Sequence, residues 1–170
     1  ETTHFSIMDK YGNAVSNTYT LNFSYGNKHV VPGTGILLNN EMDDFSSKPG
    51  EPNAYGLIGG IKNSIEPNKR MLSSMTPTIV FDSEDKVMLV TGTPGGSRII
   101  TTTLQIVVNT IDFNMNIAEA TLAPRIHHQW FPEELRIEEG LSLDTLSILH
   151  DLGYTISQKP AMGSVQSIVF

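Results

Sequence analysis

Residues 2–22 read TTHFSIMDKYGNAVSNTYTLN, and they decide the first element of the fold. Threonine, valine, isoleucine and aromatic side chains are frequent in both halves of this stretch, which is typical of β-strands. The five residues between the halves, DKYGN at 9–13, contain the aspartate, glycine and asparagine that favour hairpin turns. The pattern therefore predicts a β-hairpin with strands over 3–8 and 14–22.

The region that follows the hairpin, from 24 to 69, is rich in glycine and proline and poor in regular structure. Only 36–38 and 57–58 resemble strands within it. An irregular stretch of this length in a compact domain is usually functional or covered by a partner.

The rest of the chain predicts helices between strands. Apolar residues recur at helical spacing over 97–111, where Ser97 is the expected N-cap, and over 142–152, where Ser142 is the expected cap and Gly153 the stop. The other expected elements are a hairpin over 77–81 and 86–91, a short helix over 117–122, and strands over 135–138, 154–157 and 165–170. Strands at both ends with helices between them predict an α/β (α+β) domain of antiparallel character, with helices stacked on a sheet.

The composition excludes several classes of function. The chain has 11 Lys and Arg against 18 Asp and Glu, a net charge of −7 that argues against a nucleic-acid groove. No apolar run approaches the roughly 18 residues that span a bilayer, so no membrane span is expected. The absence of cysteine excludes thiolate nucleophiles and cysteine zinc sites. The adjacent His127 and His128 would point to opposite faces of a strand, and no metal or cofactor is expected.

Thr2 is the first candidate for chemistry. A threonine hydroxyl is a weak nucleophile unless a base adjoins it, and a free N-terminal amine with a pKa of about 7.7 to 8.0 is such a base. Glu1 precedes Thr2, so this chemistry requires cleavage of the Glu1–Thr2 bond. The alternative is that Thr2 is an ordinary strand residue.

Three polar motifs are further candidates. Gly95 and Gly96 join a strand to a helix, where backbone N–H groups can bind an oxyanion or simply make a tight turn. The acidic run 39–44 could bind calcium or a ligand's ammonium group, or be a solvated turn. The paired serines Ser73 and Ser74 could hold a carboxylate.

These motifs, taken in order, resemble the small subunit of the γ-glutamyltranspeptidases. The resemblance covers nearly the whole chain and rests on TTHFS at 2–6, NAV at 13–15, YTLN at 19–22, GILLNNEMDDF at 35–45, LSSM at 72–75, GGSR at 95–98, RIHHQW at 125–130 and MG at 162–163. It implies an N-terminal-nucleophile hydrolase with a four-layer αββα sandwich. The single domain over 1–170 would be one part of that sandwich, completed by an upstream large subunit.

The resemblance also implies a role for each site residue. Thr2 would be the nucleophile for self-cleavage and for catalysis, and Thr20 would orient it. The remaining roles are the oxyanion N–H groups (Gly95 and Gly96), the α-amino contacts (Asn22, Glu41 and Asp44) and the α-carboxylate contacts (Ser73 and Ser74, with an arginine of the large subunit).

The function so implied is γ-glutamyl transfer and hydrolysis from glutathione-like donors to amino acids, peptides or water, through a γ-glutamyl-threonine ester. It needs no cofactor, and family members of this kind imply a periplasmic or extracellular location. Alternatives in the same superfamily are a poly-γ-glutamate capsule depolymerase or transpeptidase and a β-lactam side-chain acylase. An alternative of another class is a non-catalytic binding domain.

Overall fold

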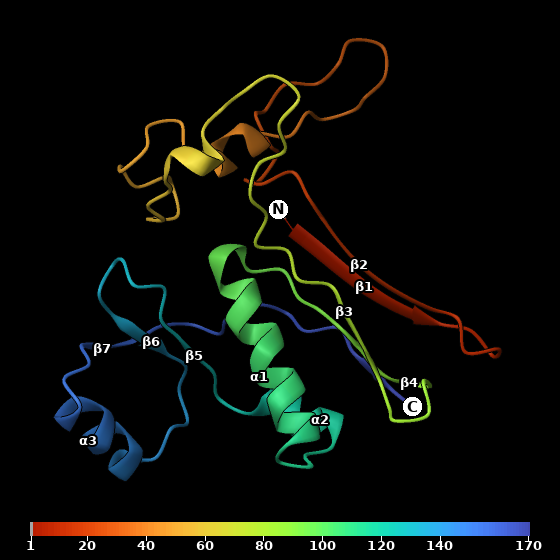
Figure 1. The fold of residues 1–170 in the computed structure, drawn as a ribbon, viewed down its shortest axis with the longest axis vertical. Helices are drawn as coiled ribbons and strands as arrows, with labels where there is room; N and C mark the ends of the chain where they lie inside the picture. Colours follow the sequence, from red (N-terminus) through yellow and green to blue (C-terminus); the bar gives the residue numbers. More distant parts are fainter. Residues whose placement is uncertain (1) are drawn as a thin grey trace.

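The computed structural model describes residues 2–170, which form three small sheets with helices beside them (Figure 1). β1 (Thr2–Met8) and β2 (Ala14–Thr20) pair antiparallel, with Thr2 opposite Thr20, and the expected hairpin is confirmed. β2 ends two residues earlier than expected. The chain leaves the sheet at Asn22, which has a φ of 67°, a conformation that asparagine tolerates better than most residues.

The second sheet has the order β3-β4-β8, and all its strands are antiparallel. β3 (Thr78–Phe81) and β4 (Val87–Thr91) confirm the second expected hairpin. The side chain of Asp82 closes its turn, because Oδ1 accepts the backbone N–H groups of Glu84 and Lys86 at 2.8 and 2.9 Å. β8 (Ile168–Val169) is shorter than the strand expected over 165–170.

The third sheet contains β5 (Ile126–His127), β6 (Leu135–Ile137) and β7 (Ile156–Gln158). The expectation of antiparallel pairing is wrong for β6 and β7, which are parallel. α3 (Leu143–Asp151) connects them, and a helical crossover is the usual link between parallel neighbours. The single helix-covered sheet that the sequence suggested is thus divided into three.

The helix α1 (Ile99–Ile111) is confirmed, but two expected details are wrong. Ser97 lies in the preceding 3₁₀ turn η3 (Gly96–Arg98), and its hydroxyl donates to Gln129 Oε1 rather than capping the helix. The apolar stripe that the helical spacing predicts is largely outward, since Ile100, Leu104 and Ile111 are 50%, 57% and 37% exposed; its other members are Val107 and Val108. The buried residues form another stripe, in which small threonines allow close approach: Ile99, Thr102, Thr103 and Ile106.

The two shorter helices begin at side-chain caps. α2 (Ile117–Leu122) starts with a capping box between Asn116 and Glu119 that the sequence analysis did not include. α3 starts as expected at Ser142, whose hydroxyl accepts the N–H of Thr145 at 3.4 Å. It stops before Gly153, which has a φ of 92° that favours glycine. Over residues 2–170, no helix combines the length and apolar character needed to cross a membrane.

The irregular region between β2 and β3 lies as a layer across the upper end of the molecule, next to the start of β1 (Figure 1). Two short 3₁₀ turns are its regular elements, η1 (Glu41–Asp44) and η2 (Ile61–Asn63). The strands expected at 36–38 and 57–58 are wrong. Each is reduced to one isolated bridge, Val30 with Leu37 and Pro52 with Ile58.

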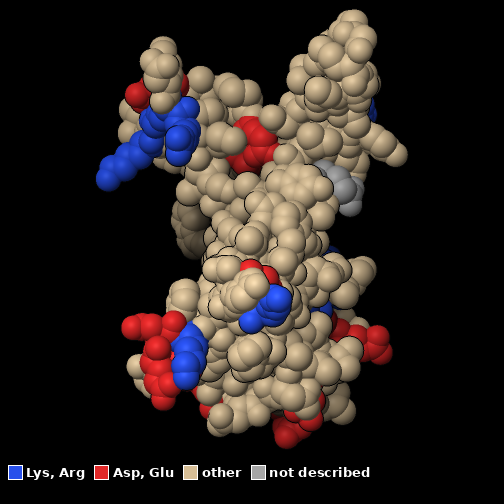
Figure 2. All heavy atoms as spheres, turned by 90° about the vertical axis from the view of Figure 1, so that its right-hand side faces the viewer, with Lys and Arg blue, Asp and Glu red and all other residues tan. Residues whose placement is uncertain are grey.

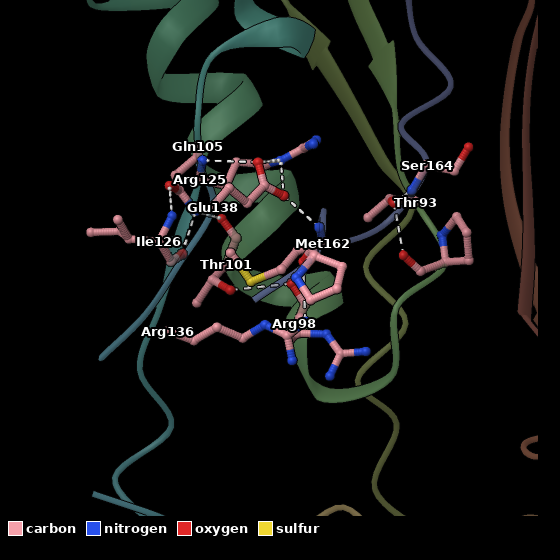
Figure 3. A network of polar contacts seen from close by, with 12 residues as sticks. Thr93, Arg98, Thr101, Gln105, Arg125, Ile126, Arg136, Glu138, Met162 and Ser164 are labelled. Carbon is pink, nitrogen blue, oxygen red and sulfur yellow. Dashed lines mark hydrogen bonds and ion pairs between the residues drawn. The ribbon is translucent and has the colours of Figure 1, made fainter. Parts of the chain in front are cut away.

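A buried ion pair anchors the C-terminal segment to the third sheet (Figure 3). Arg125 Nε lies 3.0 Å from both carboxylate oxygens of Glu138, which also accepts the backbone N–H of Met162. Two residues later, the N–H of Ser164 donates to Thr93 Oγ1 at 2.9 Å. The segment that follows β7 therefore passes from Glu138, just beyond β6, to Thr93, just beyond β4 and next to the glycine turn.

Candidate active site

Thr2 and Thr20 face each other at the open end of the first hairpin. Thr2 Oγ1 donates a hydrogen bond to Thr20 Oγ1 at 2.9 Å, and Thr20 Oγ1 also accepts the N–H of Asn22 at 2.8 Å. The pair follows from the strand register, because residues directly opposite each other in an antiparallel pair point to the same face. The structure thus brings together two of the residues that the sequence singled out.

A cavity of about 380 Å³ opens beside this pair. Seven of the nine predicted site residues line it: Thr2, Thr20, Asn22, Asp44, Ser73, Ser74 and Gly96. Gly95 lies on a neighbouring open cleft of about 800 Å³, which Thr2, Asn22 and Gly96 share. Glu41 lies on neither wall, but its carboxyl contacts that of Asp44. All nine residues therefore belong to one locality, although they come from segments up to 94 residues apart in numbering, from Thr2 to Gly96.

The turn η1 concentrates negative charge beside the cavity. The carboxyl groups of Glu41 and Asp44 share a hydrogen bond, and burial together with Asp44 raises the pKa of Glu41 to about 7. Burial likewise raises the pKa of Asp44. Glu41 Oε1 and Asp43 Oδ2 are buried and accept no hydrogen bond from the described part of the chain. This arrangement can accept a cationic group.

Acidic atoms are visible in the hollow between the two upper lobes of the molecule (Figure 2). Among residues 2–170, no three His, Asp or Glu side chains are grouped in a way that could hold a metal ion.

The raised pKa of Glu41 predicts how stability depends on pH. The folded protein keeps a proton on this carboxyl up to about pH 7, whereas the unfolded chain releases it near 4.5. The stability that protonated Glu41 contributes to the folded state is therefore complete below pH 4.5 and is lost as the pH rises through about 7. In thermal unfolding, Glu41→Gln should gain stability relative to wild type as the pH rises over this range.

The matched control is Glu66→Gln. Hydrogen bonding to Lys69 lowers the pKa of Glu66, so this substitution should change the pH dependence with the opposite sign and below pH 4.5. If the melting temperatures of wild type and Glu41→Gln change with pH in the same way between pH 4.5 and 8, the assignment to Glu41 is contradicted.

The glycine turn between β4 and α1 has a backbone that other residues rarely adopt. Gly95 has a φ of 147° and Gly96 a φ of 62°. A Cβ atom on Gly96 would lie 2.9 Å from Cε1 of the Tyr55 ring. The positive φ and the lack of space for a Cβ atom both require glycine where the turn borders the Thr2 cavity. Backbone N–H groups can therefore approach a bound molecule closely.

Tyr55 is a site residue that the sequence analysis missed. Its hydroxyl donates to Asn22 Oδ1 at 2.7 Å, and its ring lies against Gly96. Burial and the carboxylates of η1 raise the pKa of Tyr55, which therefore stays a hydrogen-bond donor. Asn53 holds the local turn by accepting the N–H groups of Tyr55 and Leu57, each at 3.0 Å.

The sequence carried a signal for the Tyr55 turn, because asparagine and glycine flank the aromatic residue at 53–56. It carried no signal for the partners of Tyr55. They lie 33 residues upstream and 41 residues downstream, at separations that no local pattern spans.

The histidines at 127 and 128 lie as the sequence predicted, with His127 buried and His128 exposed. His127 makes two hydrogen bonds, through Nδ1 to Thr101 Oγ1 at 2.7 Å and through Nε2 to Gln129 Oε1 at 2.9 Å. Burial lowers the pKa of His127, which favours the neutral ring. His127 therefore packs behind the glycine turn, with both ring nitrogens in hydrogen bonds.

Known proteins resemble this chain in sequence over its whole length. The family model described as Gamma-glutamyltranspeptidase matches residues 1–170. The glutathione hydrolase proenzyme of Escherichia coli (strain K12) is 62% identical over 169 residues, which are 99% of this chain and 29% of that protein. The chain thus spans less than a third of the length of this relative.

Solved structures agree with the sequence match. A threonine-to-alanine mutant of Helicobacter pylori γ-glutamyltranspeptidase superposes with a TM-score of 0.95 at 60% identity, over 98% of this chain and 90% of that one. An acivicin-inhibited γ-glutamyltranspeptidase gives a TM-score of 0.94, also at 60% identity, over 98% of this chain and 89% of that one. The expected N-terminal-nucleophile hydrolase fold is confirmed, and the chain belongs to the γ-glutamyltranspeptidase family.

Proposed function

We propose that this chain is the catalytic part of an enzyme that hydrolyses and transfers γ-glutamyl groups, with Thr2 as the nucleophile. One observation carries the proposal: the Thr2 hydroxyl is held by Thr20 at 2.9 Å on the wall of a cavity that also contains Asp44, Ser73, Ser74 and Gly96. The proposed nucleophile, ammonium site, carboxylate site and oxyanion turn would thus adjoin one space. Glutathione and related γ-glutamyl peptides carry the matching groups.

The reaction begins from a Thr2 whose amine is free, after the Glu1–Thr2 bond has been cleaved; Glu1 lies outside the described residues. The amine accepts the proton of Oγ1 while Oγ1 attacks the γ-carbonyl carbon. The N–H groups of Gly95 and Gly96 stabilise the resulting oxyanion. The Thr2 ammonium then protonates the leaving amine, and a γ-glutamyl-threonine ester remains.

The second half of the reaction regenerates Thr2. The Thr2 amine accepts a proton from water, or from the amine of an amino acid or peptide, as that group attacks the ester carbonyl. Collapse of the tetrahedral intermediate returns the Oγ1–H group and releases glutamate or a new γ-glutamyl compound. The hydrogen bond that Thr2 Oγ1 donates to Thr20 orients the hydroxyl before attack, and after Oγ1 has lost its proton the Thr20 hydroxyl would donate to it instead.

Donor recognition follows from charge. Glu41 and Asp44, with the amide of Asn22, would bind the α-ammonium group of the donor, and Ser73 and Ser74 its α-carboxylate. The unpaired Oε1 of Glu41 supports the part of this residue in the first assignment, because a bound ammonium would supply the hydrogen bond that it lacks.

The rest of the precursor would complete the site as a large subunit. It would supply an arginine for the α-carboxylate and cover the outward face of the first hairpin, where Phe5, Ile7, Val15 and Tyr19 are exposed. We place the assembled enzyme in the periplasm or outside the cell, as the family resemblance implies.

Mass spectrometry of the active, full-length gene product tests the proposal. We expect two polypeptides, one of which begins at Thr2, together with release of p-nitroaniline from γ-glutamyl-p-nitroanilide. Active material with an intact Glu1–Thr2 bond would overturn the role of the amine. A folded protein that is neither cleaved nor active would favour a non-catalytic binding domain.

Asp44→Asn tests the ammonium site. The substitution keeps the shape of the side chain but removes its charge, so the KM for γ-glutamyl-p-nitroanilide should rise about 10- to 150-fold. Circular dichroism should stay near wild type. The control Asp144→Asn removes an exposed carboxylate in the first turn of α3 and should leave KM unchanged. An unchanged KM in Asp44→Asn would refute the assignment.

A further inference from the structure

The side-chain amide of Gln129 lies between the glycine turn and the Tyr55 loop and bonds to both. Nε2 donates to the carbonyl oxygen of Tyr55 at 3.1 Å and to that of Phe131 at 2.9 Å. Oε1 accepts the hydroxyl of Ser97 at 2.8 Å and pairs with His127 Nε2 at 2.9 Å. Ser97 directly follows Gly96, and Tyr55 lies against Gly96 from the other side.

These four contacts use the whole hydrogen-bonding capacity that one amide commonly offers, two donors and two acceptor positions. The two carbonyl partners can only accept, so Nε2 must face them and Oε1 must face Ser97 and His127. His127 therefore carries its proton on Nε2, and its Nδ1 is an acceptor 2.7 Å from the Thr101 hydroxyl, which also lies 3.1 Å from the carbonyl oxygen of Arg98. The amide has one orientation, because rotating it would turn Oε1 toward the two carbonyl oxygens, which cannot donate.

The base of this arrangement is rigid. His127 is only 7% exposed and belongs to β5, so the segment that carries Gln129 is fixed to the third sheet. The Tyr55 loop has little regular structure of its own and packs against this segment. The packing is close, because a Cβ on Gly56 would lie 3.4 Å from Cδ of Pro132. The loop is thus held from behind by residues that do not line the Thr2 cavity.

We propose that Gln129 is a positioning residue, which sets the distance between the Tyr55 loop and the Gly96–Ser97 turn and acts on the active site through Tyr55. Tyr55 reaches two parts of the site, Asn22 through its hydroxyl and Gly96 through its ring. When Gln129 is replaced, the tyrosine is free to withdraw from both. The kinetic consequence rests on the proposed γ-glutamyl chemistry, whereas the structural consequence does not.

Hydrogen–deuterium exchange on the full-length protein tests the structural part. Gln129→Met keeps the size of the side chain and removes all four hydrogen bonds. Backbone amides over residues 53–58 should then exchange about 5- to 10-fold faster. Gln105→Met is the matched control, because Gln105 also bridges backbone groups, at Thr101 and Ile126, but does not touch the Tyr55 loop.

We expect the Gln105 variant to leave exchange over 53–58 at the wild-type rate, even if both variants lose similar thermal stability. Equal exchange over 53–58 in wild type and Gln129→Met would overturn the proposal, whatever the enzyme does. So would faster exchange of that segment to the same degree in both variants, because the effect would then be a general loss of stability.

A double-mutant cycle tests the route through Tyr55. Gln129→Met should lower kcat/KM for γ-glutamyl-p-nitroanilide about 10- to 100-fold, since small displacements at a reacting site have effects of this size. In the double variant with Tyr55→Phe, kcat/KM should equal that of the more impaired single variant, because both substitutions loosen the same contact. Multiplicative losses would show that Gln129 does not act through Tyr55.

The two arms separate the possible failures. If the wild-type protein has no γ-glutamyl activity, the proposed function fails while the exchange experiment still decides the role of Gln129. If the wild type is active and Gln129→Met retains both its kcat/KM and the slow exchange of 53–58, the inference about Gln129 fails and the proposed function stands.

Discussion

Thr2→Ala should leave the precursor uncut and lower turnover of γ-glutamyl-p-nitroanilide by about 10⁴-fold or more, as the loss of a nucleophile does in other hydrolases. The reason is that one hydroxyl, held at 2.9 Å by Thr20, would serve both reactions. Thr2→Ser keeps the hydroxyl but not the methyl group that fixes its rotamer, so it should be cleaved and active at a reduced rate.

The neighbouring threonine provides the control for Thr2. Thr3 points to the opposite face of β1, is exposed, and pairs with Tyr19 across the hairpin. Thr3→Ala changes the same atoms one position away and should be processed and active. Two subunits on a denaturing gel from Thr2→Ala would show that another residue performs the cleavage.

Gly96→Val should lower kcat by about 10² to 10³, the loss typical of removing one oxyanion donor. Valine is strained at the φ of 62°, and its Cβ would meet the Tyr55 ring at 2.9 Å. The ring must then withdraw, and its hydroxyl bond to Asn22 weakens as well. Turnover is measured with saturating γ-glutamyl-p-nitroanilide, and folding by circular dichroism and subunit association.

Gly33→Val separates crowding from backbone strain. Gly33 has a comparable φ of 78°, but nothing lies within 4 Å of the position that its Cβ would occupy. Its substitution should therefore carry the strain without the catalytic loss. A folded Gly96→Val protein with normal turnover would show that the turn is structural only.

The part of the site that lies on regular structure could be predicted from the sequence. Local alternation and the turn residues were enough to predict the hairpin that carries Thr2 and Thr20, whereas the pairing of these two threonines was implied by the family resemblance. The glycine turn is likewise a local feature between a strand and a helix. The second and third sheets were harder, since β8 and β7 are short and their partners, β4 and β6, lie far away or across a helix.

The contacts made by loops could not be predicted in the same way. Tyr55 meets Asn22 and Gly96, and Gln129 meets Tyr55 from a segment 74 residues away. Such pairs depend on how the whole chain packs, which the spacing of residues along the sequence does not predict. The outward stripe of α1 shows the same limit, because a helix that is apolar on several sides does not reveal which side the strands cover.

The register of the first hairpin links a distant turn to the position of the proposed nucleophile. Six rungs separate the pair of Thr2 and Thr20 from that of Met8 and Ala14, a distance of about 20 Å along the strands. A single residue gained or lost at positions 9–13 would slide one strand against the other by one step and bring Tyr19 or Leu21 opposite Thr2 in place of Thr20. The number of residues in the turn therefore determines which residue of the second strand lies opposite the proposed nucleophile.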